Sequence, residues 1–199
     1  MSFKTNELAE MKVVKVRMQK RARVLGLLCI ATCMIMLAGC QQSLPSPDTW
    51  QEYKLGGGIY GVKFPSKPKE VTQSTPSVVG TLKVELHQLE VSRNFALVSS
   101  CTQMPPVEAY DVDKGLSAAT QGAATNAKSK VKSSTDISKN GVKGKDVYFE
   151  GPDNAVMRAK IYISTKGSTP AIFSAIIVSN KKSRLEDEAA NAFFDSMNF

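Results

Sequence analysis

Residues 171–178 read AIFSAIIV, and all but the serine are apolar. Successive side chains of a β-strand point to opposite faces of its sheet. Both faces of this segment are therefore apolar: Phe173, Ala175 and Ile177 on one, and Ile172, Ile176 and Val178 on the other. An antiparallel strand with one face in water would carry polar residues on that face. The segment predicts a strand covered on both faces, and hence a fold of three layers.

The preceding segment, residues 155–165, alternates with the same period of two. One face is wholly apolar and the other is mixed: Met157, Ala159, Ile161 and Ile163 against Val156, Arg158, Lys160 and Tyr162. We expect this strand to lie beside the first one, joined to it by a turn at residues 166–168.

Two further turns continue this series towards the N-terminus. Asn140-Gly141 supplies the positive φ angles of a type I′ turn, and residues 151–154, GPDN, are typical of another turn. Three consecutive turns predict four neighbouring antiparallel strands, at about residues 131–139, 142–150, 155–165 and 169–179.

Two helices are available to cover the two faces. From Asp111 to about Lys130 a narrow, Ala-rich stripe recurs every three to four residues: Val112, Leu116, Ala119, Ala123 and Ala127. At the C-terminal end, Ser183 and Glu186 match a capping box. Behind it lies a second stripe, formed by Leu185, Ala189, Phe193 and Met197. The expected fold class is therefore α+β, an antiparallel β-sheet flanked by helices on both faces in an α/β/α sandwich.

The N-terminal half of this region also reads mainly as strands. We expect strands at residues 50–54 and 59–64, separated by the triglycine 56–58, with Pro65 and Pro68 ending the pairing. Residues 79–91 and 95–103 form a hairpin around residues 92–94. The alternation in 79–91 changes parity after Leu86, which predicts a β-bulge near His87.

With these elements placed, the region resembles the Mog1/PsbP-like family of α/β/α sandwiches, in particular its bacterial lipoprotein-type members. The similar motifs are YGVKFPSKPKE (60–70), VKGKDVYFE (142–150), MRAKIYI (157–163) and AANAFFDSMNF (189–199), with Met197 where the family has an aromatic residue. The resemblance implies this fold, with Phe64 filling the core and Gly144 relieving crowding. It implies no shared active site, because the family's functions are diverse.

The first 39 residues have the pattern of an export signal. Residues 12–23 are strongly basic, and residues 24–37, VLGLLCIATCMIML, are apolar and uncharged. Fourteen helical residues span about 21 Å, which is shorter than the ~30 Å hydrocarbon core of a bilayer. A signal peptide fits this segment better than a permanent transmembrane helix. Translation from Met11 or Met18, rather than Met1, would give a leader of more usual length.

Leu37-Ala38-Gly39-Cys40 resembles the bacterial lipobox, at the expected end of that leader. There the thiolate of Cys40 would take a diacylglyceryl group, and Leu37, Ala38 and Gly39 would be recognised by the signal peptidase before cleavage. Two or more acyl chains anchor a protein stably to a bilayer. The alternatives are ordinary cleavage after Gly39 and a buried cysteine beside a core helix.

The sequence thus divides into a lipoprotein signal peptide (1–39), a lipidated cysteine with a flexible tether (40–49) and a folded domain (50–199). This organisation predicts an extracytoplasmic protein held by lipid, with the outer membrane favoured in a Gram-negative cell because Gln41, and not Asp, follows the cysteine. The leader has seven Lys/Arg and two Glu, so it accounts for five of the eight net positive charges. The basic composition is therefore weak evidence for an anionic partner, and we expect no nucleic-acid binding.

One group of lysines stands out in the domain: Lys128, Lys130, Lys132, Lys139, Lys143 and Lys145. They suit either of two roles. They can face anionic headgroups or an acidic wall polymer, or they can be solvated edge-strand lysines that prevent sheet-to-sheet aggregation.

The domain has few residues suited to catalysis. His87 is its one histidine, and we expect it to be solvated on its strand. Cys101 shares strand parity with Phe95 and Leu97, which indicates a small buried residue. Asp111 and Asp113 suit helix N-capping better than metal binding. We therefore predict no catalytic, cofactor-binding or metal-binding residues and no cofactor.

These observations favour a non-enzymatic binding or assembly module, a monomer with the bilayer and an envelope protein as partners. Two alternatives stay open. A hydrolase based on carboxylates would need two or more acids converging in an apolar pocket. A carrier of small ligands would need a closed apolar cavity of several hundred Å³.

Overall fold

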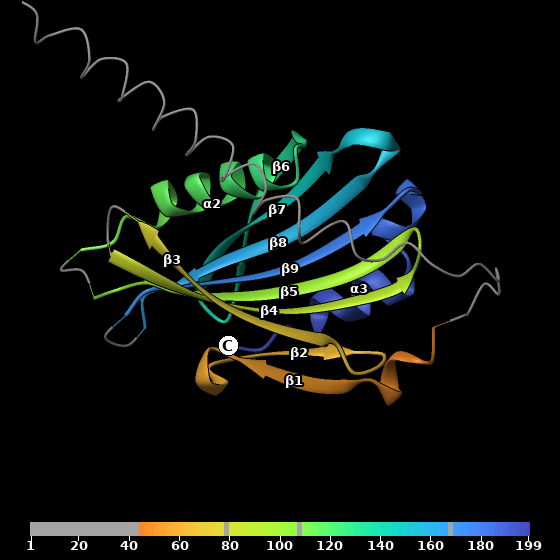
Figure 1. Ribbon diagram of the computed structural model, residues 1–199, viewed down its shortest axis with the longest axis horizontal. Coiled ribbons are helices and arrows are strands. Elements are labelled where there is room, and N and C mark those ends of the chain that lie inside the picture. Colours follow the sequence, from red (N-terminus) through yellow and green to blue (C-terminus); the bar gives the residue numbers. More distant parts are fainter. Residues whose placement is uncertain (1–43, 78–79, 107–108, 167–168) are drawn as a thin grey trace, which may run out of the picture. The chain divides into compact units, whose positions relative to one another are not determined.

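The computed structural model describes residues 44–77, 80–106, 109–166 and 169–199. Its centre is a seven-stranded antiparallel sheet in the order β3-β4-β5-β9-β8-β7-β6 (Figure 1). The strands are β3 (Lys69–Ser77), β4 (Gly80–Ser92), β5 (Phe95–Gln103), β6 (Lys130–Lys139), β7 (Val142–Glu150), β8 (Val156–Ser164) and β9 (Ala171–Ser179). The two remaining strands, β1 (Gln51–Leu55) and β2 (Tyr60–Phe64), pair only with each other in a separate ribbon.

The sheet joins two meanders through one non-local pairing. Strands β3, β4 and β5 follow one another, as do β6, β7, β8 and β9, and antiparallel pairing of β5 with β9 connects the two sets. The predicted four-stranded meander is confirmed. Asn140 and Gly141 at its first turn have φ angles of 53° and 77°, which are the positive values that a type I′ turn requires.

Helices cover both faces of this sheet, as expected for the α+β sandwich. Helix α2 (Val112–Asn126) packs on one side, here called the α2 face, against a core that includes Leu116, Val147 and Ile161. Helix α3 (Glu188–Asp195) packs on the other side, the α3 face, together with the β1–β2 ribbon. The two sets of apolar residues in β9 contact these two separate cores, so the strand is covered on both faces.

The α3 face holds the larger side chains. Tyr60, Phe64, Phe193 and Phe194 are 0–1% exposed, and the rings of Phe64 and Phe193 meet edge to face with centroids 5.2 Å apart. The ribbon is tied to the chain's end, because Gly61 and Asn198 exchange backbone hydrogen bonds of 2.8 and 2.9 Å. Aromatic packing of this kind contributes beyond the area it buries.

Gly144 is needed where β7 passes β8. A Cβ at this position would lie 2.5 Å from the carbonyl oxygen of Ile161 and from Cδ1 of Tyr162. No side chain fits at such a distance, which agrees with the crowding expected there.

Strand β3 was not anticipated from the sequence. Its residues, KEVTQSTPS, are mostly polar and include a proline, so they show no apolar alternation. The strand forms all the same because it lies at the edge of the sheet and pairs on one side only, with β4. Proline is tolerated on edge strands, where its missing N–H need not reach a neighbour.

The predicted bulge near His87 is wrong. The register between β3 and β4 is continuous through His87, and the register between β4 and β5 shifts only between Glu90 and Ser92. The parity of the apolar residues changes because the two halves of β4 turn their apolar side chains to different layers. Leu82, Val84 and Leu86 lie on the α2 face, whereas His87, Leu89 and Val91 lie on the α3 face.

The C-terminal helix begins later than the predicted capping box. Ser183 lies in a 3₁₀ turn, Lys182–Leu185, and makes no cap hydrogen bond. The N-cap of α3 is Asp187, whose side chain accepts a 2.9 Å hydrogen bond from the backbone N–H of Ala190. Buried Leu185 precedes the helix, and its burial in the α3-face core holds the 3₁₀ turn in place.

Part of the predicted flexible tether is packed against the domain. Leu44 contacts the α3-face core, and Pro47–Thr49 form a 3₁₀ turn. Trp50 is 5% exposed, and its Nε1 donates a 2.9 Å hydrogen bond to the carbonyl oxygen of Pro45. Burial of the indole ring draws these residues onto the surface of the domain.

Candidate functional site

Helix α2 covers only part of its face of the sheet. It contacts β6, β7 and β8, and within the described ranges no other helix lies over β3, β4 and β5 on this side (Figure 1). The apolar side chains left there are half-buried and belong to neither core: Val71, Leu82, Val84, Leu86, Ala96 and Val98. We call this surface the open face.

Strand register makes the open face continuous. Val71 is the cross-strand partner of Leu86, Val98 is the partner of Ile176, and Ala96 is the partner of Val178. Ile176 and Val178 pack partly against the core under α2. The open face therefore extends the surface on which α2 already lies.

Two hydroxyl groups meet at the border of the open face, that of Ser100 on β5 and that of buried Ser174 on β9. The Oγ atoms of Ser100 and Ser174 are 2.7 Å apart, close enough for one to donate a hydrogen bond to the other. Among the described residues, neither hydroxyl group is hydrogen-bonded to a base, and His87 lies on the opposite face of the sheet by strand parity. This pair can donate and accept hydrogen bonds, but its geometry is not that of an activated nucleophile.

His87 is buried and not solvated, contrary to expectation. Its side chain is 6% exposed and lies against the rings of Tyr53 and Phe64, at centroid distances of 6.1 and 6.3 Å. The β1–β2 ribbon, whose position the sequence did not indicate, covers it. Burial lowers the pKa of His87, against the opposing effect of Glu70 and Glu85. Its Nδ1 has no hydrogen-bond partner among the described residues.

A polar network fixes the triglycine turn between β1 and β2. The carboxylate of Glu85 accepts a 2.6 Å hydrogen bond from the N–H of Gly56 and pairs with Lys83 at 2.6 Å. The hydrogen bond from Lys83 lowers the pKa of Glu85. The turn needs Gly56 because its φ is 63° and a Cβ would lie 2.6 Å from Sγ of Cys101. This network holds the ribbon in place.

Cys101 is fully buried, as its strand parity predicted. Burial, with a smaller contribution from Glu85, raises the pKa of its thiol to about 12. A thiol with such a pKa is not a nucleophile at neutral pH, because the thiolate is the reactive form.

Arg158 is the centre of a charged cluster on the α3 face. It donates hydrogen bonds of 3.0 and 2.7 Å to the two carboxylate oxygens of Asp146 and one of 3.1 Å to the carbonyl oxygen of Leu185. Its guanidinium also lies over the rings of Tyr148 and Phe194. These contacts attach the segment before α3 to the sheet, which is a structural role.

Within the ranges that the structure describes, three of the six singled-out lysines form ion pairs with acids, and a fourth is hydrogen-bonded to the backbone. The ion pairs are Lys132–Glu150 at 3.0 Å, Lys143–Asp113 at 3.2 Å and Lys145–Asp136 at 2.6 Å. Lys139 donates a 2.7 Å hydrogen bond to the carbonyl oxygen of Asp195. Lys130, Lys132 and Lys139 lie on β6, an edge strand of the sheet.

Of the two acids expected to cap the helix, Asp111 and Asp113, only the first does so. Asp111 is the N-cap of α2 and accepts a 3.0 Å hydrogen bond from the N–H of Lys114, which lowers its pKa. Asp113 instead pairs with Lys143. Among the residues in the described ranges, no group of three or more His, Cys, Asp or Glu side chains is arranged to hold a metal ion.

The predicted lipidation site lies outside the described residues. This holds for Cys40 and for the three residues of the peptidase recognition motif, Leu37, Ala38 and Gly39. Of the helices from residue 44 onwards that the structure describes, none has the length and apolar character needed to span a membrane.

Comparisons with known proteins add little beyond these observations. No family model matches the sequence, and the search of curated proteins found no match. Among solved structures, the chain is similar to the solution structure of cyanobacterial PsbP (CyanoP) from Synechocystis sp. PCC 6803. The two are 9% identical, with a TM-score of 0.49 over 82% of this chain and 98% of that chain. This likeness is too distant to show family membership, so the fold class rests on the sheet and helices themselves.

Proposed function

We propose that this chain is an extracytoplasmic lipoprotein, anchored through acylated Cys40, whose domain is a non-enzymatic binding module. Its partner would be an amphipathic helix of another envelope protein, bound on the open face. The observation that carries the proposal is the incomplete cover of the sheet, which leaves apolar side chains of three adjacent strands partly exposed.

The size of the open face supports a single helix as its occupant. Neighbouring strands lie about 4.8 Å apart, so the three strands β3 to β5 span about 10 Å. This matches the 10–12 Å diameter of an α-helix with its side chains. The surface next to it already binds α2, through a stripe that includes Leu116 and Ala124. A second helix laid beside α2 would complete the layer.

The two alternatives find less support. The pKa values of three carboxylates are lowered by lysines or backbone N–H groups, those of Glu85, Asp111 and Asp136. A general acid needs a raised pKa instead. A cavity of about 350 Å³ does exist, lined by Leu44, Pro45, Pro65, Ser66, Leu89, Glu90 and Val91. It opens to solvent, unlike the closed cavity of a small-ligand carrier.

Site-specific photocrosslinking in native membranes tests the binding surface. A photoreactive amino acid at Val98 or Leu86 should capture the same protein, and one at exposed Lys54, on the ribbon, should not. A Val98→Lys substitution should abolish capture through Leu86, with an unchanged circular dichroism spectrum as the control for folding. Identical products from Lys54, or capture that persists in Val98→Lys, would contradict the proposal.

The anchor is tested separately by Cys40→Ala. The variant should accumulate as an uncleaved precursor and lose incorporation of labelled palmitate. Normal labelling of the variant would exclude lipidation at Cys40, whatever the crosslinking shows.

A further inference from the structure

The packed part of the chain begins very close to the proposed lipid attachment point. Leu44 and Pro45 are already held against the domain, through the α3-face core and the indole of Trp50. Only residues 41–43 separate Leu44 from Cys40. Four residue steps reach at most about 14 Å even when fully extended. An acylated Cys40 therefore restricts the Leu44 end of the domain to the immediate vicinity of the bilayer.

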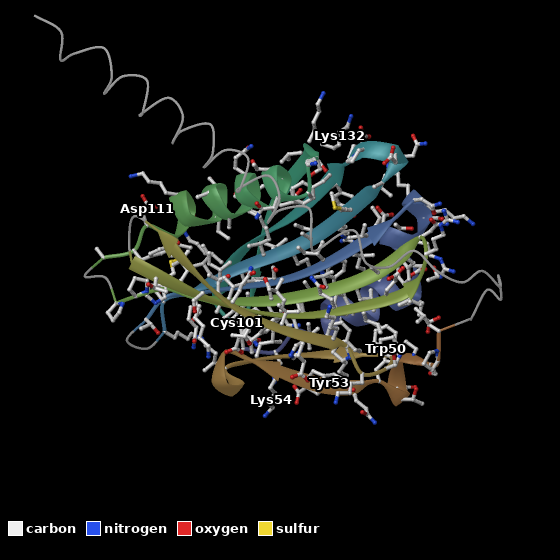
Figure 2. All side chains as sticks on the ribbon, in the orientation of Figure 1. Trp50, Tyr53, Lys54, Cys101, Asp111 and Lys132 are labelled. Carbon is white, nitrogen blue, oxygen red and sulfur yellow. The ribbon has the colours of Figure 1, made fainter. Side chains whose placement is uncertain are left out.

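Several loops meet at this end of the domain. Leu44 and Pro45 line one cavity with Pro65 of the β2–β3 loop and with Leu89 and Val91 of β4. Beyond them, the turn from β4 to β5 lies beside the end of β9, since the N–H of Asn180 donates a 3.4 Å hydrogen bond to the carbonyl oxygen of Asn94. Figure 2 shows Trp50 and Asp111 at opposite ends of the domain.

The free basic side chains of these loops form a second feature of the same end. Lys67, Arg93, Lys181 and Lys182 are exposed, and none has an ion pair within the described part of the chain. The lysines of β6 and β7 differ, since Lys132, Lys143 and Lys145 are all paired with acids. We call the four unpaired residues the basic end.

Exposed acidic side chains share this end of the domain but do not pair with the basic end. Arg184 is neutralised by Asp187 at 3.1 Å. The other exposed acids of this end include Asp48, Glu90, Glu186 and Asp153, which lies on the turn leading into β8 beside the end of β9. Within the described part of the chain, none of these acids forms an ion pair with the four basic residues, so the basic end is available to an anion next to the apolar cavity walls of Leu44, Leu89 and Val91.

We infer that the basic end lies on the anchoring bilayer and binds the anionic headgroups of its phospholipids. The inference rests on the proposed acylation of Cys40, which brings the bilayer within reach. Lys and Arg side chains near an anionic surface are attracted to it over about one Debye length. The short tether and the basic end together would hold the domain in one orientation on the bilayer, whereas a longer tether alone would let the domain rotate.

The test uses the native acylated chain in phosphatidylethanolamine vesicles with or without phosphatidylglycerol. A cysteine replacing exposed Ser92, beside Arg93, or exposed Thr165, at the opposite end of the sheet, carries a fluorescent label. Buried Cys101 should not react. A quencher attached to the lipid headgroups then reports which end lies on the membrane.

With phosphatidylglycerol present, we expect strong quenching at Ser92 and weak quenching at Thr165. Most of the difference should disappear in 1 M salt, where the Debye length is about 3 Å. It should also disappear in the triple variant Arg93→Glu, Lys181→Glu, Lys182→Glu. The matched control Lys54→Glu, Lys114→Glu, Lys166→Glu carries the same change of charge elsewhere and should quench like the parent.

Other outcomes separate the two levels of the proposal. Equal quenching at both positions in an acylated protein overturns the orientation and leaves the anchor intact. Quenching at Ser92 that the triple variant or salt leaves unchanged overturns the role of the anionic headgroups. A chain whose mass shows no acyl group at Cys40 overturns the anchor and the orientation together.

Discussion

The two faces of the sheet are covered in different ways. On the α3 face a helix and a two-stranded ribbon enclose large aromatic side chains, and the core there includes Tyr60, Phe64 and Phe193 at 0% exposure. On the α2 face one helix with small residues covers β6 to β8 and leaves the apolar side chains of β3 to β5 partly exposed. From this difference we expect the closed face to contribute most of the stability, and the open face is the surface on which we propose that a partner binds.

The largest expected difference between the faces comes from truncating one apolar side chain on each. Phe64→Ala removes a ring that contacts Phe193 and Tyr53, and should lower the free energy of unfolding by about 3–5 kcal/mol. Val98→Ala on the open face should cost about 1 kcal/mol or less, because its side chain is only half buried. Denaturant unfolding of both variants gives the comparison, and equal losses would contradict it.

The next effect concerns the charged cluster on the closed face. Arg158→Met leaves the carboxylate of Asp146, whose side chain is 14% exposed, without its partner. We expect a loss of about 2–3 kcal/mol in the free energy of unfolding. Asp146→Leu in the same background should recover part of that loss, since no buried charge then stays unpaired. A double-mutant cycle measures the coupling, and additive losses would show that the two residues do not interact.

Removing the N-cap of each helix tests how much that helix stabilises the face of the sheet that it covers. Asp187→Ala, at the start of α3, and Asp111→Ala, at the start of α2, should each cost about 1 kcal/mol of unfolding free energy. Ser183→Ala is the matched control and should change little, because Ser183 makes no cap hydrogen bond. A loss at Ser183 as large as that at Asp187 would place the helix start where the capping-box pattern put it.

The smallest effect is a pH dependence confined to the closed face. The pKa of buried His87 is lowered in the folded state, so below about pH 6.5 the unfolded chain binds more protons than the folded one. Its contribution to stability is complete above pH 6.5 and decreases as the pH falls, by less than the ~1.4 kcal/mol per pH unit of one full proton. His87→Gln should flatten the difference between unfolding curves at pH 7 and pH 5.5. An unchanged difference would exclude His87 as its source.

Much of the fold is encoded in local patterns. The alternation in β8 and β9, the Ala-rich stripe of α2 and the turn at Asn140-Gly141 predict the meander and the two layers on the sheet. These features depend on residues close in sequence, so a pattern of period two or three to four is enough to detect them.

The features that the sequence patterns do not predict depend on contacts between segments that are distant in the sequence. His87 is buried because the β1–β2 ribbon lies over it, and β3 pairs despite its polar sequence because β4 offers a free edge. The open face was not found for the same reason. Val84, Leu86 and Val98 alternate like buried residues, and only the position of α2 reveals that they are partly exposed.

The single junction between β5 and β9 has a consequence for how this chain folds. Each meander can form from neighbouring segments, whereas their union must close a long loop and carries the entropic cost of doing so. We expect the halves to organise early and the central junction to form last. A chain that crosses a membrane from its N-terminus would then stay loosely structured until β9 has followed β5 to the other side.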